Sequence, residues 1–264
     1  MSVNPVISTP EFLSRAEIEE RVGHMLQYIF PDRHNDTNPP DLRQAVEILH
    51  IKYRIGFSFS EILGRMPNGN KILGMFSVSP LIIRVCSSIK RWSPAFCRTL
   101  AHELGHLVLH RKMIGDGKQI SREKPIIDTA RQLRYRETAE LSDLGWVEWQ
   151  ANEFAMCLIL PRRYLQYLVV KAQIELGINR NIGTMYLDDQ VCNMQNCGRI
   201  ISRISGLMAI NDALLWRRLR FLGILEDHQK RRAKPIFEML DALFETENGQ
   251  PAVAQSHKPS GEPL

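Results

Sequence analysis

The residues with the clearest chemical pattern are His102, Glu103 and His106, which form the motif H-E-x-x-H within the segment AHELGH. The surrounding apolar residues recur with a helical period. The two histidines therefore share one helix face, about 40° apart around the axis and ~6 Å along it. Both imidazoles can reach one metal ion, and Glu103 is placed to take a proton from a water molecule that the metal activates. The motif predicts a catalytic zinc site, with Mn²⁺ or Fe²⁺ as alternative ions.

Glu148 is the best candidate for a third ligand. It lies in the segment VEWQANEFAMCLILP, where Glu148 and Asn152 share one face of the helix that the segment predicts. The small Ala151 and Ala155 allow this helix to approach another closely. We expect it to cross the HExxH helix and supply the Glu148 carboxylate, while Asn152 accepts a ring N–H from a liganding histidine.

His110 is a competing candidate ligand. The metzincin pattern is excluded because Leu109 and Lys112 stand at its glycine and histidine positions. On a continuous helix, His110 lies ~12 Å beyond His102, too far for both to bind one tetrahedral ion. We expect His110 either to orient a neighbouring side chain or to cap the negative end of the helix dipole.

The elements that position these residues follow from the periodicity of the chain. Apolar residues with helical spacing, bounded by capping residues or prolines, predict helices over residues 9–30 (with Ser8 or Thr9 as N-cap), 41–49, 94–108 and 147–160. Residues 51–88 have the character of β-strands around the turn signal PNGN, and residues 115–138 predict a loop or short helix. We therefore predict an α+β fold, with a small antiparallel sheet packed on the HExxH helix and mostly helical flanks.

Composition excludes several classes of protein. The chain has 264 residues, of which 44% are hydrophobic and 24% charged, unlike collagenous or mainly disordered chains. A net charge of +5 could favour acidic partners or nucleic acid, but it requires neither. The start of the chain lacks a secretory signal, and its longest uncharged apolar stretch is too short to cross a bilayer. We expect a cytoplasmic protein that does not contact membranes.

The five cysteines are odd in number and scattered, so we expect reduced thiols rather than a disulfide framework. Cys192 and Cys197 come closest to a pair. Their spacing does not match that of common structural zinc sites, and no second pair follows.

The sequence resembles the ImmA/IrrE-type metallo-endopeptidases. The resemblance is carried by FCRTLAHELGHLVLH and EWQANEFAMCLILP, and more loosely by PPDLRQAVEILHIKY and ISGLMAINDALLWRRLRFLGIL, and it covers roughly residues 9–228. It implies a gluzincin-like zinc site with His102, His106 and Glu148 as ligands and Glu103 as general base. It also implies helix-turn-helix repressors of stress or mobile-element switches as the substrate class. The segment 161–204 is longer than usual for this family, and the residues after 225 match no sensor domain.

The segment 208–225 has the pattern of a helix-turn-helix unit, with Asn211 as N-cap and Arg217, Arg218 and Arg220 beyond it. These arginines could contact phosphate, or the helix pair could pack on the catalytic core and leave them in solvent. We expect the second arrangement and no DNA partner. The predicted parts are a metallopeptidase domain (1–165), a helical helix-turn-helix-like region (166–246) and a disordered tail (247–264).

These observations predict a zinc endopeptidase that hydrolyses a peptide bond in a protein substrate, with a helix-turn-helix repressor as partner. The strand expected over 80–87 could pair with an extended substrate, and Tyr135 and His110 are candidates to stabilise the oxyanion. The alternative is a non-catalytic DNA- or protein-binding regulator with a structural metal site. Glu103 favours the enzyme, because a structural site needs no base beside its ligand. An aminopeptidase would need a group that binds the free amine, and the sequence identifies none.

Overall fold

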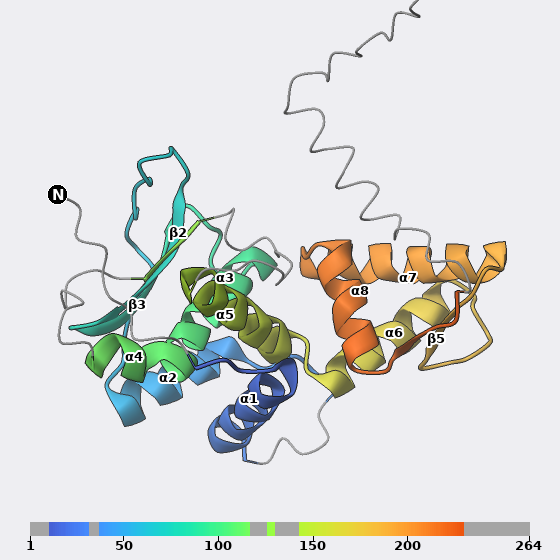
Figure 1. Cartoon of the computed structure of the whole chain (residues 1–264), viewed down its shortest axis with the longest axis horizontal. Coiled ribbons are helices and arrows are strands. Elements are labelled where there is room, and N and C mark those ends of the chain that lie inside the picture. The colour runs from blue at the N-terminus through green and yellow to red at the C-terminus, as the bar shows by residue number, and fades with distance from the viewer. Residues whose placement is uncertain (1–10, 32–36, 117–125, 130–142, 230–264) are drawn as a thin grey trace, which may run out of the picture.

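The computed structural model describes residues 11–31, 37–116, 126–129 and 143–229, and their elements form two groups (Figure 1). The first group holds a sheet and helices α1 (Arg15–Ile29), α2 (Leu42–Tyr53), α3 (Pro94–Gly105), α4 (Arg111–Asp116) and α5 (Asp143–Ile159). A π-helical turn, η1 (His106–His110), joins α3 to α4. The second group holds helices α6 (Arg162–Glu175), α7 (Val191–Met208) and α8 (Asp212–Phe221) with the short strands β5 (Met185–Leu187) and β6 (Leu225–Asp227). The α+β prediction is confirmed.

The sheet of the first group has the strand order β1-β3-β2-β4, with strands β1 (Gly56–Ser58), β2 (Ile72–Val78), β3 (Leu81–Val85) and β4 (Ile126–Thr129). Strand β2 runs antiparallel to β3, as predicted, and also antiparallel to β4, but β1 runs parallel to β3. The sheet is therefore mixed. The connection from β1 to β2 is long enough to carry the chain past the position that β3 later fills.

The position of β3 corrects the expectation that residues 80–87 receive an extended substrate. Strand β3 lies between β1 and β2, and it is hydrogen-bonded to both. A strand whose two edges are already paired cannot accept a further strand.

The sheet packs on α3 through residues that alternate along the strands. Phe76 on β2 and Ile83 on β3 are buried in the same core cluster as Leu100 and Leu104 of α3, and both strands contact that helix. Each such buried side chain stabilises the fold by roughly 1.5–3 kcal/mol. This packing fixes the helix that carries the HExxH motif.

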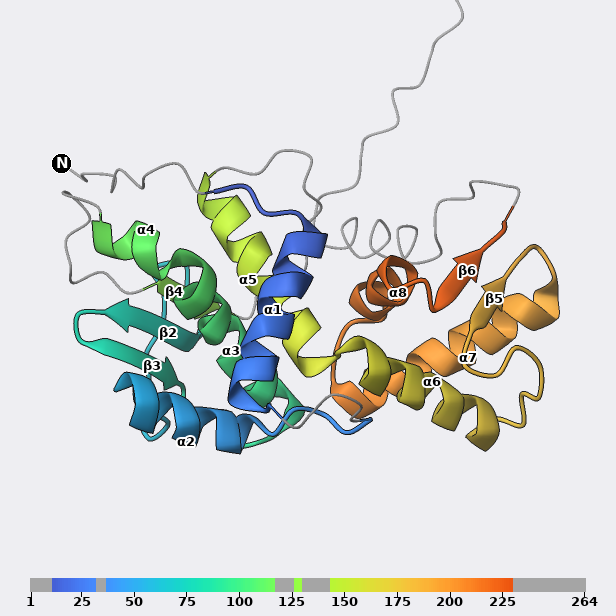
Figure 2. The same ribbon diagram turned by 90° about the horizontal axis from the view of Figure 1, so that it is seen from below.

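Helix α3 begins as its sequence predicted. The Ser93 hydroxyl accepts a hydrogen bond from the Phe96 N–H at 3.3 Å, and Pro94 occupies the first turn. Helix α5 crosses α3 and is also covered by α1, so that it lies between them (Figure 2). This sandwiched position explains why nearly all of the segment 147–160 is buried.

Elements α1, α2 and β4 differ from their predictions. Helix α1 begins after Ser14, whose side chain and that of Glu17 form a capping box, and not after Ser8 or Thr9. Helix α2 continues to Tyr53, into a segment expected to be a strand, and ends at Arg54 in the left-handed conformation. Strand β4 lies within the segment expected to be loop or short helix, because the free edge of β2 supplies the pairing that its short sequence does not signal.

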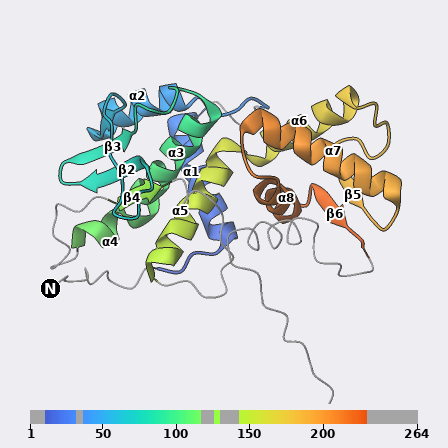
Figure 3. The same cartoon turned by 90° about the horizontal axis from the view of Figure 1, so that it is seen from above.

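Within the segment 208–225, predicted to be a helix-turn-helix unit, the structure forms a turn and one helix, α8, which follows α7 in the chain (Figure 3). The Asn211 side chain accepts from the Ala213 N–H at 2.7 Å, which confirms the predicted N-cap. Arg98 on α3 donates to the Ala209 carbonyl at 2.6 Å, so the turn between α7 and α8 is tied to the first group.

Two expectations about the chemistry of the chain can be compared with the described residues. All five cysteines are free thiols. Among the described helices, none combines the length and the apolar character that crossing a membrane requires. The predicted tail, 247–264, lies outside the described residues.

Candidate metal centre

His102 and His106 lie on the buried side of the helix, where α3 passes into η1. Both side chains are completely buried, and their Nε2 atoms are 2.9 Å apart. The four-residue spacing therefore brings the two ring nitrogens to one point, as the motif predicted.

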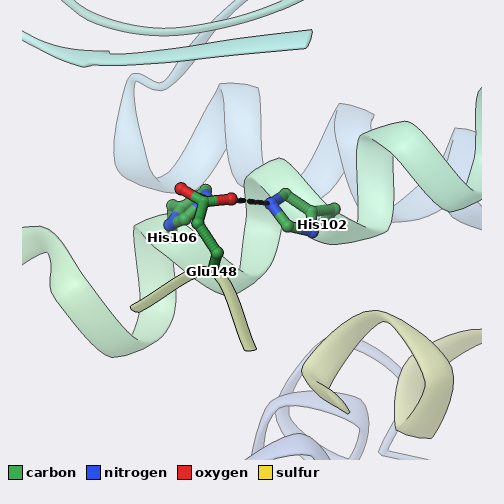
Figure 4. Close-up of side chains that lie close together, drawn as sticks. All are labelled: His102, His106 and Glu148. Atoms are coloured by element: carbon green, nitrogen blue, oxygen red, sulfur yellow. Dashed lines mark hydrogen bonds and ion pairs between the residues drawn. The ribbon is translucent and has the colours of Figure 1, made fainter. Parts of the chain in front are cut away.

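Glu148 reaches the same point from α5 (Figure 4). Its Oε2 atom lies 3.4 Å from His102 Nε2, and its Oε1 atom lies 3.7 Å from His106 Nε2. The three residues offer ligand atoms that all lie within 4.8 Å of one another. The structure thus brings together the residues that sequence analysis selected.

The close approach of α5 to α3 depends on small residues at the crossing. A Cβ atom added to Gly105 would lie 3.0 Å from the Cα and 3.1 Å from the carbonyl oxygen of Ala151. Sequence analysis expected Ala151 at this contact but did not select Gly105. The signal was available, because a glycine inside a helical pattern commonly has a packing reason.

The donor set fits a zinc ion. Ligand atoms 2.0–2.1 Å from a tetrahedral ion lie about 3.3 Å from one another, close to the separations found here. Burial is the main cause that lowers the pKa of His106 to about 3; Glu148 opposes this shift and His102 adds to it. His106 is therefore neutral at pH 7, which is the form that binds metals. His102, His106 and Glu148 could hold the ion and leave a fourth position open.

Asn152 makes the contact with a ligand that its place on the helix predicted. Its Oδ1 atom lies 2.9 Å from His102 Nδ1. Because an amide oxygen only accepts, His102 donates from Nδ1, which leaves the Nε2 lone pair directed at the cluster.

His110 lies outside the cluster but contacts it. Its Nδ1 atom is 3.2 Å from His106 Nδ1, and its Nε2 atom is 3.1 Å from Gln150 Oε1. The expectation that it orients a neighbour agrees with these contacts. The expected helix end is absent, because the helical backbone continues through η1 into α4. Burial, together with His106, lowers the pKa of His110 to about 3, so this ring is neutral too.

Glu103 belongs to α3, and its side chain is buried against strand β2. A Cβ atom added to Gly74 would lie 2.1 Å from Glu103 Oε1, so the carboxylate occupies space that only glycine leaves open. Sequence analysis missed Gly74. An isolated glycine within a strand pattern is the signal that could have found it.

The three arginines of α8 do not share one environment. Arg218 is buried and forms an ion pair with Glu19 of α1, with Nη2 2.9 Å from Oε1, and it donates to the Leu160 carbonyl at 3.1 Å. Arg218 therefore fits neither predicted arrangement, because its guanidinium is neither in solvent nor available to phosphate. Arg220 is half exposed, as expected. Tyr135, which was a candidate to stabilise the oxyanion, lies outside the described residues.

Comparison with known families confirms the resemblance. Residues 93–175 match the model of the peptidase M78 family, described as the IrrE N-terminal-like domain. The match spans the HExxH motif and Glu148, so this part of the chain is a metallopeptidase-like domain with a His-His-Glu cluster that could bind a metal. No curated protein and no solved structure matches the chain.

Proposed function

We propose that this protein is a zinc-dependent endopeptidase that cleaves a protein substrate, with His102, His106 and Glu148 as metal ligands and Glu103 as general base. The convergence of two imidazoles and one carboxylate from α3, η1 and α5 carries the proposal. The match to a peptidase family supports it independently.

The roles of the residues follow from their positions. Zinc, when bound, supplies Lewis-acid polarisation of the scissile carbonyl and of the attacking water. Asn152 and His110 contact the Nδ1 atoms of His102 and His106, which leaves the Nε2 atoms of both rings for the metal. Glu103, one residue from a ligand, accepts the proton of the attacking water and delivers it to the leaving amine. Gly74 leaves the space that the Glu103 carboxylate needs.

The proposed substrate is a helix-turn-helix repressor in the cytoplasm. Support comes from the family match and from the free cysteines, which suit a reducing compartment. We also propose that the metallopeptidase part extends through α6, since the family match runs to residue 175 and a boundary at 165 would divide that helix.

The test is co-expression with the helix-turn-helix repressor encoded nearest the gene of this protein. We expect a cleaved repressor with the wild-type chain and an intact one with Glu103→Gln, which keeps the size of the side chain but accepts a proton poorly. Glu175→Gln, an exposed change on α6, is the matched control and should cleave normally. Cleavage by Glu103→Gln at the wild-type rate would refute the proposed mechanism.

A further inference from the structure

A chain of three hydrogen bonds leads away from His106 to the start of the described chain. It runs from His106 Nδ1 to His110 Nδ1 at 3.2 Å, from His110 Nε2 to Gln150 Oε1 at 3.1 Å, and from Gln150 Nε2 to the Glu11 carbonyl at 2.8 Å. His110 and Gln150 are both buried, so water does not compete for these bonds.

The last acceptor determines the direction of every bond in the chain. The Glu11 carbonyl can only accept, so Gln150 must turn its NH₂ group towards it and its oxygen towards His110. His110 then donates from Nε2 and, with one proton on its ring, accepts at Nδ1. His106 must therefore donate from Nδ1, which leaves its Nε2 lone pair for the cluster.

The Glu11 carbonyl is itself held in place by packing. The neighbouring Leu13 is buried, and the Phe12 ring meets Trp146 of α5 edge-on, with ring centroids 4.8 Å apart. Ser14 then starts α1 through its capping box. The segment 11–14 is thus held between α5, the helix that supplies Glu148, and the start of α1.

We infer that His110 and Gln150 are positioning residues that set the tautomer and ring orientation of His106, and that the segment at Glu11 anchors them. This inference rests on the proposed metal site and extends it to residues that touch neither metal nor substrate. The π-helical turn η1 contributes, because it is the backbone that presents His110 to both His106 and Gln150.

The experiment measures zinc affinity and not activity. Metal-free protein is titrated with Zn²⁺ against a chromophoric chelator. Loss of an outer partner of a ligand typically weakens metal binding 10–100-fold, and we expect about this loss for His110→Leu. Gln150→Leu should weaken binding less, because it acts one bond further away. His110→Asn keeps an acceptor near the Nδ1 position and should restore most of the affinity.

Gln173→Leu is the matched control. Gln173 is equally buried and also bonds backbone groups, at Asn181, Gly183 and Thr184, but it lies in the second group. This variant should lose stability and keep its zinc affinity, which separates positioning from general damage. His-selective NMR of the zinc-loaded protein adds a second measure, since His106 should carry its proton on Nδ1 in the wild type.

The outcomes separate the two proposals. Wild-type affinity in His110→Leu and Gln150→Leu would overturn this inference alone, as would equal losses in Gln150→Leu and Gln173→Leu. A wild-type chain that binds no zinc would overturn the proposed function and this inference together.

Discussion

Two buried polar clusters join α5 to its neighbours, one towards each end of the helix. The metal cluster consists of His102, His106 and Glu148. The arginine cluster consists of Arg218 with its partners Glu19, Cys157 and the Leu160 carbonyl. Both take a carboxylate out of water, which costs several kcal/mol unless positive charge compensates it.

The two clusters meet this requirement differently. In the arginine cluster the guanidinium of Arg218 supplies the positive charge from within the chain, and backbone oxygen satisfies its remaining donors. The metal cluster combines a carboxylate with two imidazoles, of which His106 is neutral because burial lowers its pKa to about 3. A cluster of this kind is suited to a cation from solution. The difference distinguishes a structural ion pair from a binding site, although both are buried.

The largest effect is expected on zinc binding, when one histidine ligand of the metal cluster is removed. His102→Ala or His106→Ala should abolish stoichiometric zinc binding, because two remaining ligands hold zinc poorly against water. Metal analysis after dialysis measures this, with the exposed His24→Ala of α1 as control. Full metal occupancy in either variant would contradict the ligand assignment.

The corresponding change in the arginine cluster should reduce stability rather than metal binding. Arg218→Met leaves Glu19 without its cation, and we expect a loss of about 3 kcal/mol, the lower end for a broken buried pair because Glu19 stays 31% exposed. Urea unfolding measures the free energy. Arg218→Met combined with Glu19→Gln should be less destabilised than Arg218→Met alone. If Arg218→Met alone also loses zinc, the two clusters are coupled, and the distinction between a structural ion pair and a metal site is wrong.

A third change addresses the base without touching a ligand. In Gly74→Ala the new methyl group would displace the Glu103 carboxylate, and a misplacement of about 1 Å can cost ~100-fold in rate. Peptidase assays should show lower kcat, with zinc content unchanged. Gly23→Ala, where a Cβ atom meets nothing within 4 Å, is the control and should be fully active.

The arginine cluster should also give the protein a measurable pH dependence. Burial tends to raise the pKa of Glu19, but the hydrogen bond and charge of Arg218 outweigh it, so this pKa lies below its ordinary value of 4.5. The stability from this pair is therefore complete above pH 4.5 and is lost as the pH falls through the lowered pKa. The difference in unfolding free energy between wild type and Glu19→Gln should shrink on acidification. A difference that stays constant from pH 6 to acid would contradict the assignment.

The smallest effect is expected at the other two arginines of α8, Arg217 and Arg220, of which Arg220 is half exposed. Arg217→Ala with Arg220→Ala should leave duplex DNA binding, measured by mobility shift at physiological salt, the same as in the wild type. Arg218 is left intact because its substitution would disturb the fold. DNA binding that these two changes abolish would favour phosphate contact.

Much of the metal cluster could be predicted from sequence because its information is local. His102 and His106 lie on one helix, whose period alone determines that they face the same way. Ser93 and Asn211 cap their helices through bonds to residues two or three positions away. Glu148 was found because a carboxylate with Asn152 on one helix face complements such a pair.

The tertiary structure alone decided features that depend on residues far apart in the chain. Arg218 has the same pattern on α8 whether it faces solvent or Glu19, since periodicity identifies a helix face but not the charge opposite it. Strand β3 lies in the interior of the sheet because the connection from β1 to β2 leaves a place for it between these two strands. Gln150 supports His106 because α1 and α5 pack together and bring the Glu11 carbonyl within reach. The sequence by itself determined which residues could bind a metal, and packing between distant segments determined which groups hold them in place.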